Sequence, residues 1–195
     1  VSHTNTSYRG HLKELYLDPL HQRISQIGSI YEDGTIFLLW IDIKDTNSAI
    51  IEHLYRLLKQ YPMADKQSQY KNSVQIILTG NESVKKLFVS RYHDLNVTCD
   101  SNTLSSTFSE NIYTWYALNW TEYFQWTGKR YISADELTSV EEMVTKIHHE
   151  NKKIRFYNVP DSQEYWRLAL HVGIDLINSD RVDDLAQYLR NIKWQ

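Results

Sequence analysis

Short apolar runs alternate with longer segments of helical periodicity along most of the chain. Residues 36–43 are almost continuously apolar and contain β-branched side chains, which is typical of a strand buried on both faces, and residues 74–78 predict a second strand. Between these runs, residues 47–61 place apolar side chains at helical spacing. A strand, a helix and another strand, repeated, predict an α/β fold in which helices cover a parallel sheet.

The same patterns extend the prediction to the rest of the chain. Further strands are expected at 96–100, 112–118, 153–159 and 174–178, and further helices at 82–92, 133–151, 161–172 and 181–191. Six strands are therefore predicted, whereas a closed (β/α)8 barrel has about eight. Either two barrel strands are missing or the sheet is open. An open flavodoxin-like sheet is less favoured, because residues 44–48 contain no glycine for a phosphate loop.

Composition excludes several classes of protein. The 195 residues carry a net charge of −3, so the chain lacks the basic character of a nucleic-acid-binding protein, and no nucleic-acid partner is expected. No apolar run approaches the roughly 18 residues of a membrane-spanning helix, so no transmembrane segment is expected. Cys99 is the one cysteine, which excludes an internal disulfide and a cysteine-only metal site.

Polar residues follow the predicted strands, where parallel α/β proteins place their active sites. Asp42 lies within the first apolar run, where an ionised carboxylate is costly unless it is paired or binds a metal. Lys44 lies two residues further on, so its side chain shares the face of Asp42. The pair is either a compact acid–cation site or a structural ion pair, and the spacing alone favours neither.

Several segments of the chain match a known superfamily in the same order. They are residues 1–4, with the sequence Val-Ser-His-Thr, and residues 14–20, 38–44, 113–128, 153–157 and 173–180. Together they resemble the glycerophosphodiester phosphodiesterase and phosphatidylinositol-specific phospholipase C-like barrel superfamily. The resemblance is to a bacterial branch whose members are often exported, so an exported protein is expected. It also implies a (β/α)8 TIM-type barrel.

The resemblance implies roles for particular residues. In that superfamily two histidines act as acid and base while a divalent metal, held by three carboxylates, polarises the phosphodiester. His3 matches the second histidine, Asp42 matches the third metal carboxylate, and Lys44 matches a lysine that offsets charge on the phosphate. The metal implied is Mg²⁺ or Ca²⁺. Substrate-binding positions at the barrel mouth match Trp126, Arg155 and Asp180.

The sequence departs from the superfamily pattern at its beginning. The first histidine and the Glu-x-Asp carboxylates, which the first two barrel strands carry, have no counterpart here. We therefore expect residues 1–195 to be one barrel domain that is incomplete at its N-terminus. An upstream segment or a second chain would complete it, because unpaired strand edges favour aggregation. As the chain stands, weak metal binding and little turnover are expected.

Two functions from different classes follow. The first is metal-assisted hydrolysis of a phosphodiester, either a glycerophosphodiester or a lipid head group. The alternative is a non-catalytic carbohydrate- or ligand-binding module that uses aromatic rings between Trp115 and Trp126 to stack on a sugar. Those rings could equally fill the barrel interior.

Overall fold

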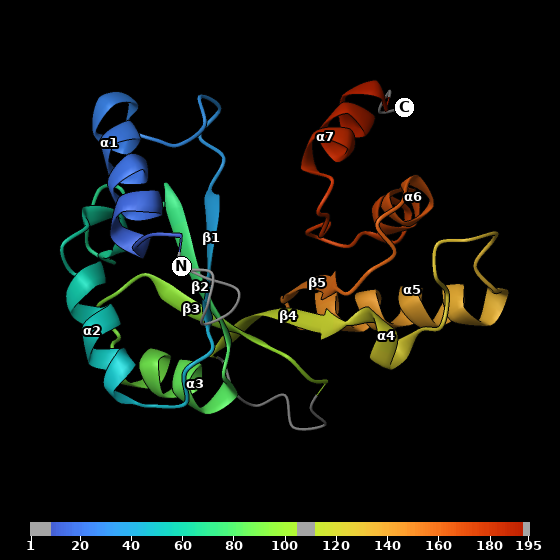
Figure 1. Ribbon diagram of the computed structural model, residues 1–195, viewed down its shortest axis with the longest axis horizontal. Helices are drawn as coiled ribbons and strands as arrows, with labels where there is room; N and C mark the ends of the chain where they lie inside the picture. Colours follow the sequence, from blue (N-terminus) through green and yellow to red (C-terminus); the bar gives the residue numbers. More distant parts are fainter. Residues whose placement is uncertain (1–8, 105–111, 193–195) are drawn as a thin grey trace. The chain divides into compact units, whose positions relative to one another are not determined.

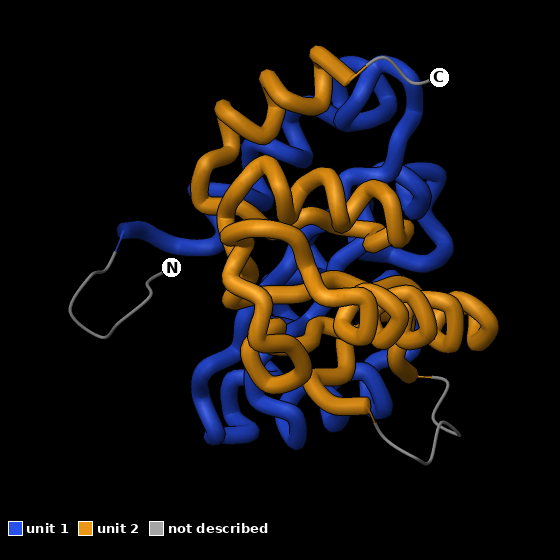
Figure 2. The backbone as a smooth tube through the Cα atoms, turned by 90° about the vertical axis from the view of Figure 1, so that its right-hand side faces the viewer, with its two compact units in different colours: residues 1–99 blue, residues 100–195 orange. Residues whose placement is uncertain are grey.

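A computed structural model describes residues 9–104 and 112–192 of the chain. The chain divides into two compact units, residues 1–99 and residues 100–195 (Figure 2). Parallel strands alternate with helices in both units (Figure 1), as the periodicity of the sequence predicts. The description of residues 1–195 as one domain stays a prediction. None of the helices in the described ranges is long and apolar enough to cross a membrane.

The first unit begins with a helical segment that the sequence patterns did not predict. A π-helical turn, η1 (Lys13–Leu17), continues directly into α1 (Asp18–Ile27). Proline lacks the N–H that continues a helix, and Pro19 lies at the junction where the π-helical turn passes into α1. Gly28 ends α1 in the left-handed conformation, with φ of 82°.

Three parallel strands follow in the order predicted. The elements are β1 (Phe37–Ile43), α2 (Ala49–Leu58), the short 3₁₀ turn η2 (Pro62–Ala64), β2 (Val74–Gly80), α3 (Glu82–Arg91) and β3 (Val97–Ser101), which crosses the boundary between the units. β1 pairs with β2 over seven residues, and β2 pairs with β3. Asp42 at the end of β1 lies opposite Thr79 of β2.

The two apolar runs of this unit differ in burial. In β2, Ile76, Ile77 and Leu78 are completely buried, as a central strand requires. In β1, only Leu39 and Ile43 are buried, so the prediction of burial on both faces is wrong for this strand. Within the described residues β1 pairs along one edge only, which leaves its other side more accessible.

The second unit repeats the alternation. Its elements are β4 (Tyr113–Asn119), α4 (Trp120–Tyr123), α5 (Ala134–His149), β5 (Lys153–Tyr157), α6 (Gln163–Val172) and α7 (Val182–Asn191). β4 and β5 are parallel neighbours. A capping pair begins α5, since the Ser133 hydroxyl accepts from the Glu136 amide at 3.2 Å. Gly173 ends α6 with φ of 80°.

The predicted sixth strand at 174–178 does not form. It makes one isolated bridge, between Leu176 and Arg155, so the described residues contain five strands. The carboxylate of Asp175 accepts from the Ile154 amide at 2.9 Å and lies 2.8 Å from Nε2 of His148. A side chain therefore takes a position on the edge of β5 that a backbone carbonyl would fill in a strand ladder.

The aromatic residues between 115 and 126 form the core of the second unit. Trp115, Tyr116, Trp120, Phe124 and Trp126 are each at most 9% exposed. The Trp120 ring packs on Phe124, Phe156 and Tyr165 at centroid distances of 4.5 to 5.3 Å. Trp120, Phe124 and Trp126 pack against one another, so for these three rings the structure supports the interior-filling interpretation.

Replacement of Tyr165 by Phe is expected to leave the free energy of unfolding unchanged or to raise it by up to about 1 kcal/mol. The Tyr165 side chain is completely buried, which raises the pKa of its phenol, and its hydroxyl finds no hydrogen-bond partner among the described residues. Removing an unpaired buried hydroxyl removes a desolvation penalty.

Tyr61→Phe is the matched control for this change. Tyr61 is also buried, but its hydroxyl donates to the Asp18 carboxylate at 2.6 Å, so its loss should cost about 1–2 kcal/mol. Urea denaturation of both variants provides the comparison. Equal destabilisation by the two changes would show that the Tyr165 hydroxyl has a partner.

Candidate functional site

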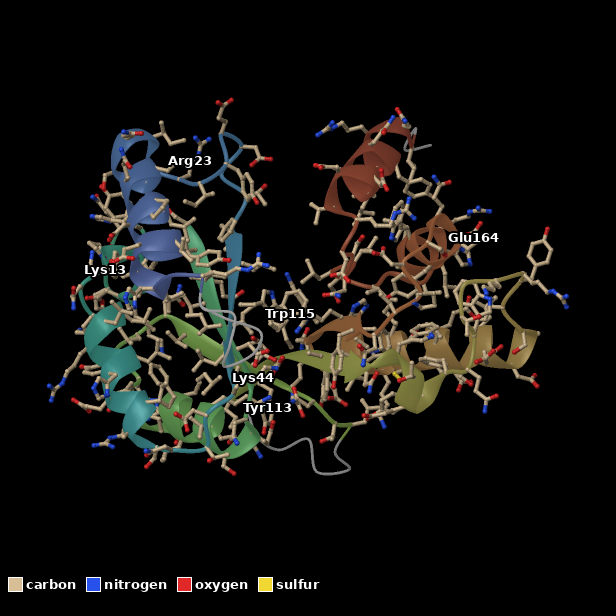
Figure 3. The ribbon with its side chains drawn as sticks, in the orientation of Figure 1. Lys13, Arg23, Lys44, Tyr113, Trp115 and Glu164 are labelled. Atoms are coloured by element: carbon tan, nitrogen blue, oxygen red, sulfur yellow. The ribbon has the colours of Figure 1, made fainter. Side chains whose placement is uncertain are left out.

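Asp42 and Lys44 form an ion pair at the carboxyl end of β1. The Lys44 ammonium lies 2.7 Å from Oδ2 of Asp42, and their side chains are 67% and 47% exposed respectively. Figure 3 shows Lys44 on the segment that leaves β1. The expected sharing of one strand face is confirmed. Solvent access removes the burial penalty that the sequence suggested, and such a pair contributes only about 0–1 kcal/mol to stability.

Gly80, at the end of β2, provides the space that the Asp42 carboxylate occupies. Its φ of +94° is in the left-handed region, and a Cβ at this position would collide with Oδ1 of Asp42 and the carbonyl oxygen of Ile43. That carbonyl accepts from the Asn81 amide at 2.7 Å. No sequence pattern indicates this close approach, because a glycine at the end of a strand usually only terminates it.

The ion pair belongs to the lining of a cavity within the first unit. The cavity has a volume of about 520 Å³ and is walled by β1, α2 and the N-terminal helical segment. Besides Asp42 and Lys44, its lining includes Leu12, Tyr16, Leu39, Trp40, Ile41, Ile43, Ile50, His53, Leu54 and Leu57. A charged pair among mostly apolar walls can orient an anion that also carries an apolar group.

Lys85 is a feature of this unit that sequence reasoning missed. It lies on α3, which begins directly after β2, and its side chain is completely buried. The ammonium lies 2.8 Å from a carboxylate oxygen of Glu82. Fully buried lysines are rare. Lysine within a helix is normally exposed, so no sequence pattern distinguishes this one.

The described residues do not fit the metal site that the superfamily resemblance implies. Within residues 9–104 and 112–192, no three His, Cys, Asp or Glu side chains gather closely enough to hold a metal ion. Of the three metal carboxylates that the resemblance implies, only the third has a counterpart in this chain, namely Asp42. One oxygen of Asp42 faces the Lys44 ammonium. A divalent ion needs several oxygen ligands, so this donor set is insufficient.

The other predicted site residues are placed as follows. His3 lies outside the described residues. Trp126 is 9% exposed and its indole N–H donates to the Arg130 carbonyl at 3.4 Å. Arg155 donates to the Asn178 side chain at 3.1 Å, while Asp180 is exposed. These three residues belong to the second unit, and their substrate-binding roles stay predictions.

Asp161 organises the neighbourhood of Asp180. Its carboxylate accepts from the Ser179 hydroxyl at 2.7 Å, from the amides of Asp180 and Arg181 at 2.9 and 3.2 Å, and from the Trp166 indole at 3.2 Å. Burial alone would raise the pKa of this carboxyl, but the four donors outweigh burial and lower the pKa. The ionised carboxylate therefore ties the start of α6 to the segment before α7.

Replacement of Asp161 by Asn is expected to lower the free energy of unfolding by about 2 kcal/mol at neutral pH. A carboxyl whose folded pKa is lowered stabilises the protein above the unfolded pKa of about 3.9 and loses that effect as pH falls through the folded pKa. The difference between wild type and variant should therefore shrink below about pH 4.

Denaturant titrations at neutral and acidic pH measure this effect. Asp184→Asn is the control, because Asp184 makes an exposed pair with Arg181 at 2.6 Å that should contribute under about 1 kcal/mol. A difference for Asp161→Asn that does not depend on pH would contradict the role of its charge.

Comparisons with known proteins give a fold likeness and no family assignment. No family model and no curated protein matches the chain. A glycerophosphodiester phosphodiesterase from Parabacteroides distasonis ATCC 8503 superposes with a TM-score of 0.51 at 14% identity over 78% of this chain. An EAL domain protein from Listeria monocytogenes EGD-e superposes with a TM-score of 0.54 at 11% identity over 93% of this chain.

The coverage of those two structures is unequal. This chain spans 56% of the length of the glycerophosphodiester phosphodiesterase and 73% of the EAL domain protein. At such low identity the likeness concerns the fold alone. It supports the predicted α/β architecture of parallel strands and helices, as found in part of a TIM-type barrel.

Proposed function

We propose that the chain recognises a phosphodiester at the carboxyl end of β1 and belongs to a protein that hydrolyses it. The observation that supports this most is the Asp42–Lys44 pair, which lies at a cavity in a chain whose fold resembles that of a glycerophosphodiester phosphodiesterase. The ends of parallel strands are where such folds place their sites. A lysine ammonium is a common partner of phosphate oxygens.

In this proposal Lys44 contacts a non-bridging phosphate oxygen and offsets the charge that develops during hydrolysis. Asp42 acts as a positioning residue, because its carboxylate fixes the ammonium at 2.7 Å. Water attacks phosphorus and loses a proton to the solvent, the bond from phosphorus to the alkoxy oxygen breaks, and the leaving alkoxide takes a proton. In this proposal His3 donates that proton, which is the role that the superfamily resemblance implies for it. No step passes through a metal, since the described donors do not fit one.

The substrate class is a small or lipid-derived phosphodiester. The apolar walls beside Lys44, among them Ile50, Leu54 and Leu57, favour an ester with an apolar or short aliphatic substituent. A glycerophosphodiester and a phospholipid head group both satisfy this requirement. We also propose that the protein is exported, on the basis of its resemblance to a superfamily branch whose members are often exported.

We also propose that a further strand pairs with the edge of β1 opposite β2. β1 is mostly apolar, and within the described residues it pairs with another strand on one side only. Unprotected edges of this kind favour pairing with another strand. An upstream segment or a second chain would supply that strand and so extend the sheet toward a barrel.

Calorimetric titration with sn-glycero-3-phosphocholine tests the proposed recognition. Lys44→Gln should weaken binding by about tenfold or more, the effect of losing one charge-assisted hydrogen bond. Lys59→Gln is the matched control, because Lys59 makes a similar exposed pair with Asp94 at 2.9 Å in the same unit. Equal affinity of the wild type and Lys44→Gln would contradict the proposal.

A further inference from the structure

A second cavity lies wholly within the second unit and involves neither Asp42 nor Lys44. Its volume is about 840 Å³, within the range of small-molecule sites. It lies between the loop at 126–132, the first turn of α5 and one stripe of α6. Glu164, labelled in Figure 3, is on that stripe. The apolar part of the lining consists of Trp126, Ile132, Leu137 and Leu168.

The loop wall of this cavity is held in place by specific contacts. Glu136 of α5 accepts from the backbone amides of Gln125 and Trp126 at 2.7 and 3.0 Å. Gly128 is buried with φ of 79°, and a Cβ there would come within 2.7 Å of Pro160 and 2.9 Å of the Ser162 hydroxyl. Because the loop is fixed at both places, the cavity is preformed and its walls need little ordering on binding.

The charges around the cavity are mostly positive. Lys129, Arg130 and Arg167 line it and are exposed, and Glu164 is the one acidic residue in the lining. Within the described part of the chain, none of the three cations has an ion-pair partner closer than 4 Å, whereas many other exposed cations of the protein do. His171 completes the polar lining and lies 3.8 Å from Glu141.

We propose that this cavity binds an amphipathic organic anion, with an apolar body against Trp126, Ile132 and Leu168 and one carboxylate or phosphate near Arg130 and Arg167. The apolar walls supply burial for the body of the ligand, at about 25 cal/mol per Å². The cationic lining selects a negative head group, and guanidinium groups can form two parallel hydrogen bonds with either anion. The proposal does not depend on the Asp42–Lys44 pair, although Trp126 is also one of the substrate-binding positions that the superfamily resemblance implies.

Titration calorimetry of the full chain tests this proposal with three ten-carbon probes that differ in their head groups. Decanoate and decyl phosphate carry the proposed charge, and decyltrimethylammonium carries the opposite one. The two anions are expected to bind, and whichever binds more tightly identifies the head group. The cation is expected to bind at least about tenfold more weakly, because it meets a net positive lining.

Arginine variants test whether the anionic probes bind in this cavity. The double change Arg130→Gln and Arg167→Gln should weaken binding of the anions by about tenfold or more, since each charge-assisted hydrogen bond contributes at least 1 kcal/mol or so. Arg190→Gln, an exposed arginine of α7 that does not line the cavity, is the control and should change affinity less than twofold or so. Thermal unfolding of each variant checks that it is folded.

Three results would overturn the proposal. They are absence of anion binding, equal binding of the cationic probe, and equal weakening by Arg190→Gln. If the double variant fails to fold, amide shift mapping of the wild type with decanoate decides the matter. Shifts at 126–132 and along α6 support the proposal, and shifts confined to other segments contradict it.

Discussion

Replacement of Asp42 by Asn is expected to act in opposite directions on phosphodiester binding and turnover. The carboxylate lies 2.7 Å from the Lys44 ammonium, so it repels a phosphate anion and competes with it for the lysine. Removing its charge should therefore raise affinity several-fold. The same change frees the ammonium to take several orientations, and loss of its alignment with the transition state should lower the turnover rate by about 100-fold.

The fold should tolerate this change. The Asp42–Lys44 pair is exposed, and such pairs contribute about 0–1 kcal/mol to stability, so the midpoint of unfolding should hardly move. Asp94→Asn is the control, because Asp94 makes the comparable pair with Lys59 away from the end of β1. Calorimetry, together with release of p-nitrophenolate from bis(p-nitrophenyl) phosphate and of choline from glycerophosphocholine, measured on both variants, separates the two effects. Unchanged turnover in Asp42→Asn would remove the assigned role.

Replacement of Gly80 by Ala is expected to lower the free energy of unfolding by about 3 kcal/mol. The added methyl group would collide with the Ile43 carbonyl and the Asp42 carboxylate, and the backbone holds a φ of +94° that alanine rarely adopts. Either β1 and β2 separate at their ends or the carboxylate moves. Because the collision with the Ile43 carbonyl displaces the backbone that carries Lys44, phosphodiester affinity should fall as well.

Gly34→Ala is the matched control for this change. Gly34 has a φ of +76°, but a Cβ there would meet nothing within 4 Å, so only the conformational cost of about 1 kcal/mol remains. Urea denaturation and calorimetry should thus separate strain from collision. Equal effects of the two substitutions on stability, with phosphodiester binding unchanged in both, would contradict the role of Gly80 beside Asp42.

Much of the fold could be predicted because the period of apolar residues reports local geometry directly. The strands β1 and β2 lie where the short apolar runs place them, and the helices α2 and α3 lie where apolar residues at helical spacing place them. The meeting of Asp42 and Lys44 follows from the strand period of 2. These features depend on residues that are close together in sequence.

The sequence predictions failed where contacts between residues far apart in the chain determine the structure. The run at 174–178 has the composition of a strand, but Asp175 bonds to the Ile154 amide and only one bridge forms. Burial of Lys85 and the approach of Gly80 to Asp42 depend on packing between elements that no local pattern encodes. The charge around the second cavity likewise comes from the loop at 126–132 and α6, which are more than 30 residues apart.

The most direct test of the central claim is a nuclear magnetic resonance titration of the ¹⁵N-labelled full chain with sn-glycero-3-phosphocholine. If the ends of β1 and β2 recognise the phosphodiester, the largest amide shift changes should fall at 42–44 and 79–81, and in Lys44→Gln their titration midpoint should move to about tenfold higher ligand concentration. Unchanged resonances at these positions at saturating ligand, or an identical titration midpoint in the Lys44→Gln variant, would contradict the assignment of phosphodiester recognition to this pair.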